Sequence, residues 1–173
     1  MSVSQPSDPV DDSVDVALFR RAVGRFATGV TVVSTFVDGH HHAMTANAFA
    51  SVSLEPPLVL VCVENDARFH DAVLDRGEWG VSVLDDTARG TADWLATPGR
   101  PLVGQLDRVP HHIGPITGAA LVDAALATLE CRTVSLHQAG DHVIVVGRVV
   151  GASLAPDGQG PLLYHRSGYR TLP

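Results

Sequence analysis

The sequence predicts an α+β fold built mostly from antiparallel strands, arranged as a small barrel rather than a doubly wound sheet. About seven short segments are rich in β-branched and aromatic residues, as strands are. Most are separated by turn sequences such as Asp38-Gly39 and Gly140-Asp141, which join antiparallel neighbours. No G-x-G-x-x-G motif follows a strand and opens a helix, so a Rossmann domain is not indicated.

The N-terminal part divides into a tail and a helix. Residues 1–14 are polar and acidic and contain two prolines, so we expect a disordered tail there and one domain over 15–173. Asp15 is a suitable N-cap for a helix, and Gly29 would close it. Apolar residues recur with helical spacing at Val16, Phe19, Val23 and Phe26.

The remaining elements follow from changes of hydrophobic period. Short helices are expected over 67–74 and 87–96. Residues 97–120 carry Gly and Pro repeatedly and predict a long loop with short extended pieces. Strands are expected over residues 30–36, 43–53, 58–63, 79–84, 125–137, 142–154, 162–165 and 168–171.

Composition excludes several classes of function. The chain has 173 residues and a net charge of −7, and four of its 19 acidic residues lie in the first fifteen positions, which contain no Arg. The rest of the chain carries a net charge of only −3, so a nucleic-acid-binding role is not indicated. All twelve basic residues are Arg, which excludes a Schiff-base lysine and a P-loop lysine. No apolar run is long enough to span a membrane, and we expect a cytoplasmic protein.

No metal site is expected. The three consecutive histidines His40, His41 and His42 would alternate between the faces of a strand, so they cannot easily converge on one ion. A solvated turn is one interpretation, and a border to a ligand on the following strand is another. Cys62 and Cys131 lie in apolar strands and are most simply core residues.

Six stretches, taken together and in order, resemble the flavin reductase family of NAD(P)H:flavin oxidoreductases. The resemblance covers about residues 17–171. It implies a mostly antiparallel FMN-binding split barrel with a few short helices. It is nearest to the reductase components of two-component, flavin-dependent monooxygenases. The stretches are TGVTVVS (28–34), AMTANAFASVSLEPPLVLVCV (43–63), WGVSVL (79–84), ATLEC (127–131), AGDHVIVVGRVV (139–150) and PLLYHRSGY (161–169).

The expected flavin site lies along an extended strand of small residues and at the exit of the next strand. Small side chains let a backbone approach the edge of a flavin ring, and Thr45 and Asn47 add polar side-chain atoms. The alternative is an edge strand whose Thr and Asn only face solvent. The candidate flavin-binding residues are His42, Ala43, Met44, Thr45, Ala46, Asn47, Ala48, Cys62, Val63, Glu64, Arg68 and Phe69.

The expected phosphate site departs from the family pattern. The resemblance implies Ser or Thr around the phosphate, but this chain has Glu64, Asp66 and Phe69 there. Arg68 is then the candidate for neutralising the phosphate, and a surface ion pair with Asp71 or Glu64 is the alternative. FMN is the expected flavin, with FAD possible.

The nicotinamide side is expected at the turn before His142 and at the C-terminal closing strands. The resemblance implies that His142 stands over the flavin as the catalytic residue, where it orients the nicotinamide or supplies a proton. The residues alone indicate only a hairpin turn. Arg166 and Tyr169 are candidates for binding NADH or NADPH, with packing of the closing strands as the alternative.

The function expected from the resemblance is hydride transfer from NADH or NADPH to FMN or FAD, by a homodimer that supplies reduced flavin to a partner monooxygenase. The protein would supply placement and exclude water, because such chemistry belongs to the cofactor. Two alternatives remain open: a flavoprotein with tightly bound FMN that acts on another small molecule, and a non-catalytic flavin- or haem-binding module.

Overall fold

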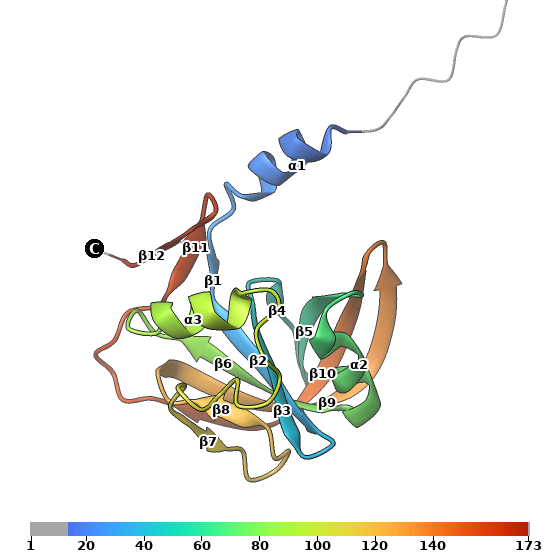
Figure 1. The fold of residues 1–173 in the computed structure, drawn as a ribbon, viewed down its shortest axis with the longest axis vertical. Helices are drawn as coiled ribbons and strands as arrows, with labels where there is room; N and C mark the ends of the chain where they lie inside the picture. Colours follow the sequence, from blue (N-terminus) through green and yellow to red (C-terminus); the bar gives the residue numbers. More distant parts are fainter. Residues whose placement is uncertain (1–13, 173) are drawn as a thin grey trace, which may run out of the picture.

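The computed structural model describes residues 14–172, which form three short helices and twelve strands (Figure 1). Nearly all of the tail predicted over 1–14 lies outside the described residues. The helices are α1 (Val16–Val23), α2 (Arg68–Arg76) and α3 (Arg89–Ala96). The strands are β1 (Thr28–Gly29), β2 (Thr31–Val37), β3 (His40–Ala46), β4 (Phe49–Leu54), β5 (Pro57–Glu64), β6 (Glu78–Leu84), β7 (His111–Ile113), β8 (Ala120–Val122), β9 (Ala125–Ala139), β10 (His142–Leu154), β11 (Leu163–His165) and β12 (Gly168–Arg170).

A seven-stranded sheet forms the body, in the order β3-β2-β6-β9-β10-β5-β4. Every neighbouring pair in it is antiparallel, which confirms the predicted fold class. In the part of the chain that the structure describes, the two edge strands β3 and β4 do not pair with each other, so the barrel stays open. Two small sheets, β1-β11-β12 and β7-β8, flank the large one.

The strand predicted over residues 43–53 is two strands. β3 pairs with β2 and β4 pairs with β5, so the chain passes from one edge of the sheet to the other at Asn47 and Ala48. The prediction of one strand was wrong because both halves have the same small, alternating composition. Only the different pairing partners separate them.

The first helix is shorter than predicted. α1 ends at Val23 with Gly24 as its C-cap, and does not continue to Gly29. Thr28 and Gly29 are instead paired with Tyr164 and Leu163 of β11, from the other end of the chain. Tertiary pairing thus overrides a local pattern that would have allowed another turn of helix. Within the loop predicted over 97–120, β7 and the start of β8 are the extended pieces.

Both faces of the sheet are buried. Val32 and Val33 are neighbours on β2 and belong to different core clusters, as the period of two in a strand requires. α3 packs on the first cluster through Leu95, and α2 packs on the second through Phe69. The apolar sequence of β2 therefore reflects burial on both sides.

Glu130, on β9, is a buried carboxylate that fixes a loop. It is 5% exposed, and its Oε2 atom accepts hydrogen bonds from the backbone N–H groups of Ile116 (2.9 Å) and Thr117 (2.7 Å) and from the Thr117 hydroxyl (2.8 Å). The loop passes so close that a Cβ on Gly114 would lie 2.6 Å from the same oxygen. Next to it, burial and the charge of Glu130 raise the pKa of the Cys131 thiol to about 12. A thiol of this kind is unreactive, as expected for a core residue.

Among residues 14–172, no helix is long and apolar enough to cross a membrane.

Candidate functional site

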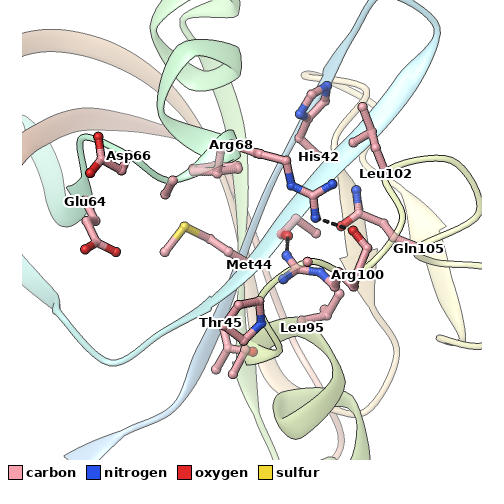
Figure 2. A pocket seen from close by; sticks show the side chains of 16 residues that line it. His42, Met44, Thr45, Glu64, Asp66, Arg68, Leu95, Arg100, Leu102 and Gln105 are labelled. Atoms are coloured by element: carbon pink, nitrogen blue, oxygen red, sulfur yellow. Dashed lines mark hydrogen bonds between the residues drawn. The ribbon is translucent and has the colours of Figure 1, made fainter.

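A cavity of about 570 Å³ lies between β3, the connection from β5 to α2, and the segment 97–105 (Figure 2). This volume is in the range of pockets that hold cofactors. Its lining residues are His42, Ala43, Met44, Thr45, Glu64, Asp66, Ala67, Arg68, Phe69, Leu95, Ala96, Pro98, Gly99, Arg100, Leu102 and Gln105. Seven of the twelve flavin-binding candidates are therefore brought together here.

The first wall is the edge strand β3. Its outer edge is not paired within the described residues, and its small residues leave the backbone close to the cavity. Met44 and Thr45 are half-buried there. The Thr45 hydroxyl donates a hydrogen bond to the carbonyl of Ala92 on α3 (2.8 Å), so its oxygen remains available as an acceptor.

The second wall is the end of β5 and the start of α2. Arg68 is the first residue of α2, and its guanidinium donates to the carbonyl of Arg100 (2.6 Å). Neither alternative ion pair is formed: Asp71 pairs with His70 (2.8 Å), and Glu64 is in no ion pair among residues 14–172. The side chain of Phe69 lines the cavity from within the second core cluster.

The third wall is the Gly- and Pro-rich segment 97–105, which the sequence had left without a role. Arg100 donates to the carbonyls of Thr97 (3.0 Å) and Ala43. Burial, and then the charge of Arg68, lower the pKa of Arg100 from its ordinary value. Gln105 is buried and donates from Nε2 to the carbonyl of His41 (2.6 Å), which holds the segment against β3.

Arg100, Leu102 and Gln105 are thus residues of the site that sequence reasoning missed. One signal in the sequence could have pointed to Arg100. It is a single arginine inside TPGRP, and an arginine within a Gly- and Pro-rich loop has few local partners for its charge. Nothing local in the sequence shows that this loop folds back onto β3. Only the hydrogen bonds to Ala43 and His41 do.

Five flavin-binding candidates do not line this cavity. Val63 and Ala46 are buried in the second core cluster, and Cys62 is half-buried on the opposite face of β5 from Val63. Asn47 and Ala48 form the bend between β3 and β4. The carbonyl of Ala48 accepts a hydrogen bond from the Cys62 N–H (3.0 Å).

A shallow groove of about 180 Å³ adjoins the cavity through Thr45 and Ala96, which line both. It is also lined by Asn47, Tyr164 and Tyr169. Tyr169 contacts Tyr164 edge to face, with ring centroids 5.5 Å apart. The structure therefore places Tyr169 beside the candidate flavin site.

Arg166 is not brought to the cavity. It lies with Ser167 in the two-residue turn between β11 and β12, where both residues have positive φ (48° and 57°). Its side chain is exposed, and its N–H donates to the carbonyl of Gly24 (2.7 Å). The observed contact of Arg166 is therefore to the chain itself.

His142 is not among the residues that line the cavity, but it lies next to one of them. It begins β10 and is paired in register with Glu64, which lines the cavity. Its Nδ1 atom is 2.7 Å from a carboxylate oxygen of the exposed Asp141, and its side chain is half-exposed. The turn is tied to the β5–α2 connection by a hydrogen bond from the Asn65 N–H to the Asp141 carbonyl (2.9 Å).

The three histidines begin β3 rather than form a turn, and they separate as strand alternation requires. His42 lines the cavity, whereas His41 contacts Phe36 and His111 on the other side. Burial is the main cause that lowers the pKa values of both rings. Of the interpretations considered, a border to a ligand site agrees with the position of His42. Within residues 14–172, no three His, Cys, Asp or Glu side chains are placed to hold a metal ion.

An open antiparallel barrel with a cofactor-sized cavity at its edge strand defines a split-barrel protein. The model of the flavin reductase like domain matches residues 23–173, and the chain therefore belongs to the flavin reductase family. This confirms the resemblance seen in the sequence and makes the protein an oxidoreductase.

Individual relatives agree. The chain is 42% identical over 164 residues to an NADH-dependent FAD reductase of Streptomyces globisporus, which covers 92% of this chain and 87% of the relative. It is 39% identical over 154 residues to the reductase component of 4-hydroxyphenylacetate 3-monooxygenase of Thermus thermophilus, at 89% and 95% coverage. The crystal structure of the flavin reductase component of a bacterial two-component tryptophan halogenase superimposes with a TM-score of 0.86, at 46% identity, and covers 92% of this chain and 99% of that one.

Proposed function

We propose that this protein transfers hydride from NADH to a flavin, FAD or FMN, and releases the reduced flavin to a flavin-dependent monooxygenase. The supporting observation is the cavity between β3, α2 and segment 97–105, which combines an extended edge of small residues with two arginines in a chain of the flavin reductase family. NADH is proposed as the donor because the Streptomyces globisporus relative is named for it.

The residues of the cavity fit a flavin. A flavin ring presents carbonyl and N–H groups along one edge, which the backbone of β3 from Ala43 to Thr45 can meet. The phosphate is an anion, and Arg68 at the start of α2 is a cation that lines the same cavity. When bound, the flavin accepts at N5 the hydride that the nicotinamide gives from C4.

The residues of this chain position the two substrates, shield the flavin ring from water and supply one imidazole. Met44 and Leu95 supply apolar surface that excludes water from the ring. His142 is the proposed catalytic residue, because it lies beside Glu64, which lines the cavity, and is exposed enough to meet a second substrate. There it orients the nicotinamide or holds a proton for the reduced flavin. We propose Tyr169 for the nicotinamide side, from the adjoining groove.

We further propose that the protein is a homodimer. α1 has no buried residue, and Figure 1 shows it projecting away from the sheet. Phe19 on α1 and Phe26 just after it are 58% and 75% exposed. An eight-residue helix is marginal alone in water, so a second copy that covers its apolar side would stabilise it. Sedimentation of the purified protein tests this, and a monomer would contradict it.

We propose the cytoplasm as its location, because NADH is regenerated there.

Consumption of NADH by the purified protein, followed by its absorbance, tests the function. The assay is run without flavin and with FMN, FAD or riboflavin. Oxidation that rises with the amount of added flavin is expected. NADH consumption that ignores added flavin, in a protein that stays yellow on gel filtration, would favour a tightly bound FMN acting on another substrate. A protein that holds flavin and leaves NADH and NADPH untouched would be a binding module.

Arg68→Ala is expected to weaken FMN binding about tenfold and to leave riboflavin binding nearly unchanged, because only FMN carries the phosphate. The measurement is titration of each flavin by the quenching of its fluorescence. Arg148→Ala removes an exposed arginine on β10 and is the matched control. If Arg68→Ala weakened both flavins equally, Arg68 would have no role at the phosphate.

A further inference from the structure

Two arginines face the cavity without a carboxylate to neutralise them. Across residues 14–172, neither Arg68 nor Arg100 takes part in an ion pair. Glu64 and Asp66 line the same cavity, but Figure 2 shows them on the side away from the two guanidinium groups. The cavity is therefore polarised, with one acidic end and one cationic end.

At the cationic end, no anion among the described residues balances the charges of the two arginines. The charge of Arg68 is near enough to lower the pKa of Arg100, which is already half-buried. Arg100 satisfies its terminal nitrogens on the carbonyls of Thr97 and Ala43, while its Nε is buried and has no hydrogen-bond partner among the described residues. Two neighbouring cations in a partly buried place cost free energy unless an anion offsets them.

The start of α2 adds to the same field. Ala67 is its N-cap, so no side chain accepts hydrogen bonds from the first N–H groups of the helix. Ala67, Arg68 and Phe69 all line the cavity. The positive end of the helix dipole and the two guanidinium groups therefore favour an anion at one place.

We propose that Arg100 is a second phosphate-binding residue, which holds the phosphate of the flavin jointly with Arg68 between α2 and the segment 97–105. This rests on the proposed function and deepens it, because it makes phosphate-bearing flavins, FMN and FAD, the preferred substrates over riboflavin. Arg100 reaches the cavity from a loop distant in sequence from α2. A phosphate held by both arginines therefore strengthens the attachment of the loop to the body of the protein, which hydrogen bonds from Arg68 to Arg100 and from Arg100 to Ala43 already provide.

Phosphate binding by Arg100 should also reduce the mobility of segment 97–105. The segment is already anchored by Gln105 on the carbonyl of His41, and Trp94 on α3 donates from its indole N–H to the carbonyl of Gln105 (2.7 Å). At the other end, Arg100 is already hydrogen-bonded to Arg68 and to Ala43, and an anion that bridges the two arginines adds a further anchor there. FMN is then expected to slow amide hydrogen exchange over residues 97–105 more than riboflavin does at equal saturation.

The decisive variant is Arg100→Gln, with Arg108→Gln as the matched control. Arg108 is an exposed arginine of the same loop region that does not line this cavity. Dissociation constants for FMN, FAD and riboflavin are measured by quenching of flavin fluorescence. Arg100→Gln is expected to weaken FMN and FAD about tenfold and riboflavin less than about twofold, while Arg108→Gln changes none of them.

Two further experiments test the role of Arg100 even if Arg100→Gln is unstable to heat. One uses the variant Arg100→Lys, and the other uses inorganic pyrophosphate as a competitor for the wild-type protein. The lysine keeps the charge but loses the planar fork, so we expect partial recovery of FMN affinity. Pyrophosphate should compete with FMN for the wild-type protein and not with riboflavin. Equal loss for all three flavins, no loss for FMN, or no competition by pyrophosphate would overturn the role of Arg100. Wild-type protein that binds no flavin would instead overturn the proposed function.

Discussion

Replacing His142 with alanine is expected to lower kcat/KM for NADH by about 10- to 100-fold, with less than about a threefold change in flavin affinity. His142 is paired in register with Glu64, which lines the cavity, and its imidazole is within hydrogen-bond distance of Asp141. Because His142 does not line the cavity itself, we expect it to act on the second substrate rather than to bind the flavin. Steady-state rates at varied NADH, together with flavin titration, separate the two effects.

His137→Ala is the control for this variant. His137 is an exposed histidine on β9, at the same hairpin, and contacts only Ser135 among the described hydrogen bonds. Its loss should leave both the rate and flavin affinity unchanged. If His142→Ala reduced flavin binding as much as turnover, the imidazole would belong to the flavin site. If neither changed, His142 would be only a residue of a hairpin turn.

Glu130→Ala is expected to lower the free energy of unfolding by about 3 kcal/mol. The substitution leaves three donors of the 114–118 loop, on Ile116 and Thr117, without their acceptor, and Thr117 is buried. The thermal midpoint should fall by about 10 °C in a domain of this size. Denaturant and thermal unfolding, followed by circular dichroism, measure the change.

Two further variants locate the cause. Glu130→Gln keeps one carbonyl oxygen for the loop donors and should lose roughly half as much stability. Asp123→Ala removes an exposed carboxylate that pairs only with His112, and it should change the stability by less than about 0.5 kcal/mol. A Glu130→Ala protein as stable as the wild type would mean that the loop donors find other acceptors.

The sequence carried those parts of the fold in which the local pattern and the tertiary environment agree. β2, β5, β6 and the long hairpin of β9 and β10 were predictable because uninterrupted apolar or β-branched runs end in recognisable turns. The end of α1 and the break between β3 and β4 were not. Each depends on which distant strand is the pairing partner, such as β11 for Thr28.

Some residues of the candidate site could likewise be placed from the sequence, and others could not. Residues 42–45 lie on the edge strand β3, and residues 64–69 lie where β5 leads into α2. Their position near one another follows from the expected barrel. Arg100 could not be placed, because nothing in a Gly- and Pro-rich segment encodes the strand it folds against. Val63 was included from its place in the chain, but alternation along β5 turns its side chain into the core.

The order of strands in the large sheet also bears on how the chain folds. Its hairpins, β2 with β3, β4 with β5 and β9 with β10, can each form from neighbouring sequence. Three further pairings unite them with β6: β2 with β6, β6 with β9, and β5 with β10. They join residues such as Val61 and Val145 that lie far apart in the chain. Closing those long loops costs entropy before any contact repays it. We therefore expect the meeting of preformed hairpins to limit the rate of folding. Substitutions at these three pairings should slow folding more than substitutions within a hairpin.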